Sequence, residues 1–413
     1  MIFRKIAYLL PFLLCGAAGG QGGAALSFEE AEKIMLASNP QALSAAAGVE
    51  KAKNGVTAAK AGFYPVFSGN ASYSRSGSQG YSASDSYSYG FSATQNLFSP
   101  EIPASLRSAQ ASLKISEASY DSTVSSLRYQ LKEAFSNIIN ARAVVTLSSE
   151  TLNRRKENLE LIRLKYQAGR ESKSALLETE TSLKTALWQH ENYKKDLTIH
   201  ERKLNRLLGR PPREKIPELA APAVPEPPED FFAFSGRLEN HFSLRSARSA
   251  VLQAKAAQET AKSSMYPSAA ASGSYSWSGS DWPDSSNGWS LGASLSIPLF
   301  AGGRLSADLK AAKKSLFSAR EELKNAMEEV SLSAEDAFLN WRQARLYIDV
   351  SRSSLEASKL RAWLVRKQYL AGQTSYFEWR NVEDQLISGE NQYLTAVKNL
   401  ALSHAFFIQS IGE

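Results

Sequence analysis

Residues 104–168 form an uninterrupted run without Gly or Pro, bounded by Pro103 and Gly169. Because these two residue types are the common helix breakers, the run predicts one continuous helix. At about 1.5 Å per residue such a helix is roughly 98 Å long, more than the core of one compact domain covers. The helix must therefore lie along neighbouring helices, or along other chains, for most of its length.

Apolar residues in this run recur at alternating spacings of three and four positions: Val124, Leu127, Leu131, Ala134, Ile138, Ala141 and Val145. That spacing places an apolar seam along one side of a helix, as in coiled-coil packing. A second run without Gly or Pro covers residues 304–371, and its seam comprises Val330, Ala334, Ala337, Trp341, Ala344 and Ile348. Two such helices in one chain indicate a tandem repeat.

Short motifs confirm the repeat at nearly constant displacement. Tyr64-Pro65 and Leu97-Phe98 recur as Tyr266-Pro267 and Leu299-Phe300, and Tyr166-x-Ala168-Gly169 recurs as Tyr369-x-Ala371-Gly372. We therefore expect a first repeat at 26–210, a Pro-rich linker at 211–228 and a second repeat at 229–413. Shorter helices are expected at 28–63, 170–208 and 373–411, and the two in the first repeat would stack end to end beside the long helix.

Strand pairs are predicted at 66–97 and 268–299, where apolar and polar residues alternate with period two. One face carries Tyr, Trp, Phe, Leu and Ala, and the other carries mostly Ser. Four such strands cannot close a barrel, and open edges in lipid would leave backbone groups without partners. Several chains would have to pool their strands, with the aromatic face toward lipid and the Ser-rich face toward a watery lumen.

The first 25 residues have the layout of a secretory signal, with Arg4 and Lys5 before an apolar run that is too short to span a membrane. Cys15 is the only cysteine, so removal of the signal would leave no thiol; lipidation of Cys15 is the alternative. The formal net charge is +7, and the Lys and Arg residues are interspersed with Glu and Asp on the predicted helix faces. This pattern favours a solvated surface over a nucleic-acid interface.

Two other architectures would also use these elements. The strands could form a soluble β-layer with a packed aromatic face, and the helices could form a solid coiled-coil scaffold in the envelope. Neither explains why a secretory signal, strand pairs of membrane-spanning length and very long helices occur together in two copies. An α+β membrane protein is the better prediction.

Several short motifs occur in a fixed order along the chain: Asn39-Pro40, Tyr64-Pro65, Tyr266-Pro267, residues 299–303, both Tyr-x-Ala-Gly motifs and Leu208-Gly209. In these motifs the chain resembles the TolC-type outer-membrane factor family. The resemblance implies a homotrimer with a twelve-stranded outer-membrane barrel that continues as a helical tunnel in the periplasm. It implies a passive exit duct that works with a periplasmic adaptor and an inner-membrane pump of the RND or ABC type. The cargo, whether drugs, metals or proteins, stays open.

No pattern of residues indicates catalysis, a cofactor or a metal. The four histidines, His190, His200, His241 and His404, are scattered without ligand spacing, so we expect surface or interface roles. An enzyme is therefore not predicted.

The resemblance implies instead a gate at the periplasmic end, around Tyr166, Gly169, Tyr369, Gly372, Thr374, Glu378 and Asn381. Tyr369 occupies the position of a Tyr that helps to lock the entrance in the best-known member, but Thr374 stands where that member has an Arg. Three copies of Glu378 would form a cation-selective ring, with a solvated surface acid as the equal alternative. Arg170, Glu171, Lys173 and Glu178 are candidates for a different lock.

Overall fold

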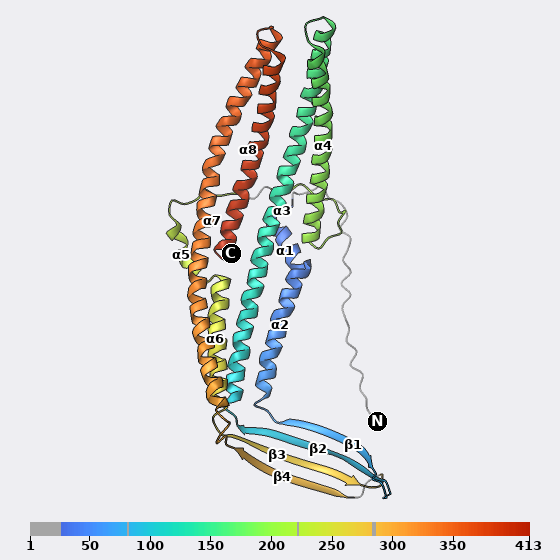
Figure 1. The fold of residues 1–413 in the computed structure, drawn as a ribbon, viewed down its shortest axis with the longest axis vertical. Coiled ribbons are helices and arrows are strands. Elements are labelled where there is room, and N and C mark those ends of the chain that lie inside the picture. The colour runs from blue at the N-terminus through green and yellow to red at the C-terminus, as the bar shows by residue number, and fades with distance from the viewer. Residues whose placement is uncertain (1–25, 81, 221–222, 283–285) are drawn as a thin grey trace.

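The computed structural model describes residues 26–413 except 81, 221–222 and 283–285. The molecule is elongated, with a sheet at one end and two helical hairpins that reach the opposite end (Figure 1). The expected signal, residues 1–25, and Cys15 within it lie outside the described residues. Among the described helices, none is long and apolar enough to be a membrane span.

The four strands form one antiparallel sheet in the order β1-β2-β3-β4. The strands are β1 (Val66–Ser76), β2 (Ser84–Phe98), β3 (Ser268–Gly279) and β4 (Asn287–Ser296). Residues paired across the sheet share a face, and the register joins Phe67 to Ala93, Ala93 to Gly273, and Gly273 to Leu291. The aromatic faces of both predicted strand pairs therefore coincide on one side of the sheet, and the Ser-rich faces coincide on the other.

The strand bounds differ from the prediction at two ends. β4 stops at Ser296, before Pro298, which cannot donate to the ladder. β2 runs to Phe98, and a bulge between Asn96 and Phe98 shifts its register against β3. The bulge removes Leu97 from the alternation that we expected to include it.

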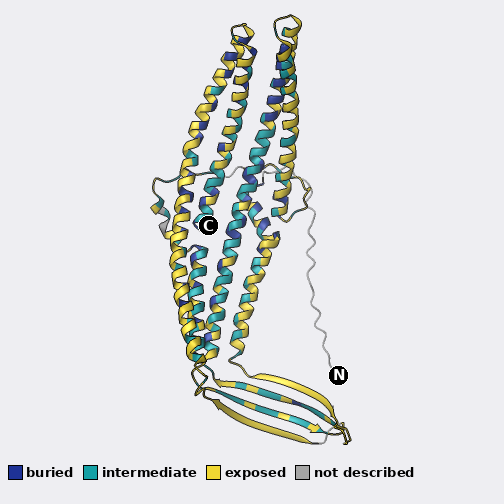
Figure 2. Cartoon of the chain, viewed as in Figure 1, coloured by how far each residue is buried: buried dark blue, intermediate teal, exposed yellow. Residues whose placement is uncertain are grey.

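The two long helices are α3 (Glu101–Gln167) and α7 (Arg304–Leu370), each of 67 residues. The first begins three residues earlier than predicted, because Pro103 lies in its first turn, where a missing N–H costs no helical hydrogen bond. Helices pack along α3 on both of its sides, α2 and α4 on one and α6 and α8 on the other. Its surface is consequently the most covered of the long helices, while α7 is largely exposed (Figure 2).

The expected single helix at 28–63 is wrong. The structure has α1 (Phe28–Ser38) and α2 (Pro40–Ala61), separated by Asn39 in an extended conformation. The residue before a proline is biased away from helical geometry, and Asn39 also caps α2 by accepting the N–H of Gln41 at 2.8 Å. The Asn-Pro pair therefore ends one helix and starts the next.

Stacking of the shorter helices end to end is confirmed. α4 (Lys173–Leu207) meets the α1/α2 break, where Ser38 Oγ donates to Leu208 O at 2.7 Å and Asn39 Nδ2 donates to Leu207 O at 2.8 Å. In the second repeat α8 (Tyr376–Ser410) ends beside His241, which caps α6 (Phe242–Ser263). Both α4 and α8 start three residues later than predicted, because Ser172 and Ser375 serve as their N-caps.

The linker runs across the middle of the helices and ends in η1 (Phe231–Phe234) and α5 (Ser235–Leu238). Equivalent arginines of the two repeats hold it. Arg142 of α3 donates to the carbonyls of Ile216 and Pro217, and Arg345 of α7 pairs with Glu226 at 2.8 Å. This layer covers one face of the helical wall.

Candidate functional site

The tip consists of the two turns farthest from the sheet, residues 168–172 and 371–375, and the first helical turns beneath them (Figure 1). Both turns are built alike. Gly169 has φ +68° and Gly372 has φ +75°, a left-handed conformation that favours Gly. The N–H after each Gly donates at 2.8 Å to a carbonyl five residues earlier: Arg170 to Lys165, and Gln373 to Gln368.

Tyr369 joins the two hairpins at the tip. Its ring is buried and stacks on Trp379 with centroids 4.6 Å apart, and Lys165 Nζ of the other hairpin lies 3.7 Å from the ring centroid. Its hydroxyl donates to Glu171 Oε1 at 2.5 Å. Burial and this carboxylate raise the pKa of Tyr369, so the hydroxyl keeps its proton and remains a donor.

A second layer of contacts lies beneath Tyr369. The hydroxyls of Thr179 and Tyr376 hydrogen-bond at 2.8 Å, and both side chains are buried. Arg380 of α8 pairs with Glu178 of α4, and its Nε lies 3.8 Å from Asp384 of its own helix. The layer therefore joins α4 to α8 through one neutral and one ionic contact.

The third layer contains a buried arginine. The side chain of Arg155 on α3 is 11% exposed and pairs with Asp384 of α8, whose side chain is 51% exposed. Beside it, Arg154 pairs with Glu390 at 2.7 Å. Since a buried arginine needs a partner, these pairs tie the two hairpins together below the turns.

The remaining expected gate residues have different surroundings. Glu378 pairs with Arg361 of α7 at 3.1 Å, so a cation of the same hairpin offsets its charge. Tyr166, Thr374 and Asn381 make no side-chain hydrogen bond or ion pair within the described residues, and Tyr166 and Asn381 are exposed. The structure thus brings Tyr369 together with Glu171, and leaves the other polar gate candidates outside that contact.

Sequence reasoning named Glu171 and Glu178 but missed Lys165, Arg155, Arg380 and Asp384. A signal for two of them was available. Arg155 precedes the first turn, and Asp384 follows the second, by similar numbers of residues. In two parallel hairpins of equal length, Arg155 and Asp384 lie at similar distances from the turns. Their opposite charges therefore predict an ion pair between the hairpins.

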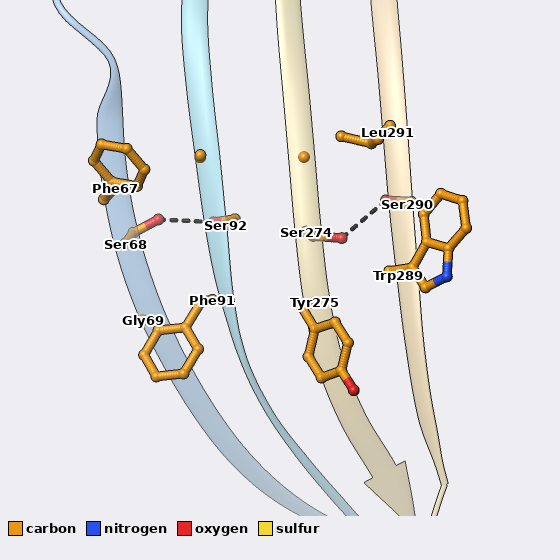
Figure 3. A pocket seen from close by; sticks show the side chains of 12 residues that line it. Phe67, Ser68, Gly69, Phe91, Ser92, Ser274, Tyr275, Trp289, Ser290 and Leu291 are labelled. Carbon is orange, nitrogen blue, oxygen red and sulfur yellow. Dashed lines mark hydrogen bonds between the residues drawn. The ribbon is translucent and has the colours of Figure 1, made fainter.

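The sheet forms the opposite end of the molecule. Its apolar face carries a groove of about 620 Å³, with Phe67 and Phe91 on one side and Tyr275, Trp289 and Leu291 on the other (Figure 3). Serine pairs bridge neighbouring strands, Ser68 with Ser92 at 2.8 Å and Ser274 with Ser290 at 2.9 Å. The aromatic and leucine side chains of the groove are those expected to face lipid, whereas the serines belong to the face expected to line the lumen.

Two histidines are more buried than a surface role would require. His241 is buried as the α6 cap, and His404 lies against the Trp341 ring with centroids 4.8 Å apart. Burial and the nearby Lys132 lower the pKa of His404 to about 4. Within the described residues, no group of three or more His, Cys, Asp or Glu is placed to hold a metal ion.

A four-stranded sheet with open edges, continued by paired helices of this length, is the architecture expected for one chain of an outer-membrane channel-tunnel. The outer membrane efflux protein family model matches residues 33–210 and 235–413, so the chain belongs to that family, as the TolC-type resemblance predicts. The two matched ranges correspond to the two repeats. The predicted outer-membrane location and efflux-channel function are therefore confirmed.

Relatives in sequence and solved structures agree with this family assignment. The outer membrane efflux protein BepC of Brucella suis biovar 1 (strain 1330) is 22% identical over 375 residues, which cover 90% of this chain and 82% of BepC. A crystal structure of CusC has a TM-score of 0.83 at 18% identity, covering 96% of this chain and 95% of that one. The Campylobacter jejuni CmeC outer membrane channel has a TM-score of 0.81 at 16% identity, and the match covers 100% of this chain and 93% of the CmeC chain. They confirm the predicted fold class.

Proposed function

We propose that three copies of this chain form the exit duct of a tripartite efflux or type I secretion system, closed at the tip in the state described. The duct is passive and is not an enzyme. It would receive its cargo through a periplasmic adaptor from an inner-membrane RND or ABC-type pump. The observation that carries the proposal is the sheet, which has two unpaired edge strands and one apolar face.

Strand directions favour closure by several copies. In the order β1-β2-β3-β4 all neighbours are antiparallel, so β4 of one copy can pair antiparallel with β1 of the next. Two copies would give eight strands, a barrel that side chains fill, whereas three copies give about twelve strands around an open lumen. Three is therefore the smallest number that leaves a duct.

Contacts at the tip support a closed entrance. Tyr369 to Glu171, Arg380 to Glu178 and Arg155 to Asp384 each join one hairpin to the other. Opening by movement of one hairpin away from its neighbour would break all three. We propose that these three contacts form the lock. They would take the role of the Arg that the best-known family member has at the position of Thr374.

Planar-bilayer recording tests the proposal. The purified protein should give small, stable current steps, and variants that break the lock should give larger ones. An envelope scaffold with a solid helical rod would give no current in either form, and that result would refute the duct.

A further inference from the structure

We propose that the wall of the tunnel carries an anion-binding pocket at mid-height, between α2, α3 and α4, that takes small molecules bearing carboxylate or phosphate groups. This inference rests on the proposed duct, because the pocket must open into its lumen. The cavity measures about 520 Å³. It lies where the Asn-Pro break between α1 and α2 meets the end of α4.

The pocket has more positive than negative charge. Lys203 and Arg206 of α4 line it, and Glu133 of α3 is the only carboxylate among its lining residues. Neither cation has a side-chain partner within the described residues. The first turn of α2 also lies there, but Pro40 has no N–H and the N–H of Gln41 already donates to Asn39, so this helix end adds only its dipole. Two unpaired cations against one carboxylate suit an anionic ligand.

His200 also lines the pocket and is partly buried there. Burial lowers its pKa first, and the positive charges of Lys203 and Lys398 lower it further, although Asp196 and Glu133 act in the opposite direction. The imidazole is therefore neutral near pH 7 and offers a hydrogen bond. Gln130, Asn137 and Gln41 add uncharged polar groups.

Helix geometry assigns the side on which the pocket opens. α1 and the linker cover the face of α3 that carries Leu131, Phe135 and Arg142. Glu133 follows Leu131 by two residues, which is about 200° around a helix, so it faces the other way. An added layer of chain cannot fill the inside of a duct, so the covered face is the outside. The pocket therefore opens toward the lumen.

Comparison of the two repeats indicates that the basic residues of the pocket are not part of the scaffold that both repeats share. At the displacement that relates Gly169 to Gly372, the positions of His200, Lys203 and Arg206 are taken by Ser403, Phe406 and Gln409. Asn137 keeps its identity as Asn340, and Glu133 is matched by Asp336. The second repeat thus keeps the acid and the Asn on the α3 side, although Ser333 replaces Gln130, and it has no cation at the three α4 positions.

Calorimetric titration of the detergent-purified protein with citrate tests the pocket. Wild type should bind citrate and not its neutral trimethyl ester. The Lys203→Gln/Arg206→Gln double variant should bind citrate about tenfold more weakly or worse, because hydrogen bonds to charged groups contribute that much to affinity. Glu133→Gln should bind it more tightly, a gain that misfolding cannot produce.

The matched control is Lys184→Gln/Arg202→Gln, which removes two cations of the same helix that are exposed, as Lys203 and Arg206 are, but do not line the pocket. Absence of citrate binding, or equal weakening by the control and by the pocket variant, would overturn the inference. Citrate added on the extracellular side should also reduce wild-type current, and less so in the pocket variant. A trimer that conducts but shows none of these effects refutes the pocket alone, whereas a monomer without current refutes the duct.

Discussion

The Arg155–Asp384 pair allows the tip lock to be tested through an asymmetry. Arg155 is almost completely buried, whereas the side chain of Asp384 is about half exposed. Asp384→Ala leaves a buried cation without a partner, at a cost of about 3 kcal/mol to the closed tip. Arg155→Met leaves an acid that water can solvate, so only about 1 kcal/mol is lost.

These values predict different degrees of opening. Since 1.4 kcal/mol changes an equilibrium tenfold, the ratio of open to closed tips should rise about 150-fold in Asp384→Ala and about fivefold in Arg155→Met. The double variant should resemble Arg155→Met, because no buried charge remains. Single-channel recording gives these ratios from the time spent at each conductance level.

Arg163→Met is the matched control, because Arg163 pairs with Glu180 within one hairpin at 3.5 Å. It should leave the conductance levels and their occupancy unchanged. Equal opening by Asp384→Ala and Arg155→Met, or greater opening by Arg155→Met, would refute the reasoning from burial. Opening by the control would show that any lost ion pair has the same effect.

Three further predictions concern other parts of the molecule. Asp at Leu291 should weaken assembly in the membrane by about 2 kcal/mol, whereas Asp at Ser294 on the other face should be tolerated; equal yields of assembled protein from outer membranes would contradict the facing of the sheet. Arg361→Gln should free the charge of Glu378 and increase cation selectivity, and Glu378→Gln should decrease it, as reversal potentials in a salt gradient would reveal; unchanged values in both would make Glu378 a solvated acid. In the folded chain His404 has a pKa of about 4, whereas in the unfolded chain it takes up a proton near pH 6.5. The melting temperature should therefore fall as the pH drops from about 6.5 to about 4, and it should fall less in His404→Phe. An equal pH dependence of the two proteins would show that His404 does not cause this loss of stability.

The sequence predicts the long helices and the strand faces well, because both depend on local patterns. Gly and Pro bound the helices, and alternation of Ser with aromatic residues defines the strands. The break at Asn39 is hidden in the sequence because the Ala-rich pattern on both sides of Pro40 favours a continuous helix. The later starts of α4 and α8 depend on whether Ser172 and Ser375 cap the helix, which the composition of the turn does not determine.

The tip was harder to predict. Tyr369 was found through the family motif, but its partner could have been any of several acids near the first turn. The choice of Glu171 depends on how the two hairpins are rotated about their axes. The Arg155–Asp384 pair depends on their relative height as well. Both quantities are tertiary, and small changes in helix packing alter them.

Closure of the barrel by three copies is the central claim, since the lumen, the tip and the mid-height pocket all depend on it. Light scattering of the protein in mild detergent, corrected for bound detergent, measures the number of copies directly. We expect a single species with the mass of three chains. A monomer, or a dimer with eight strands, would contradict the account.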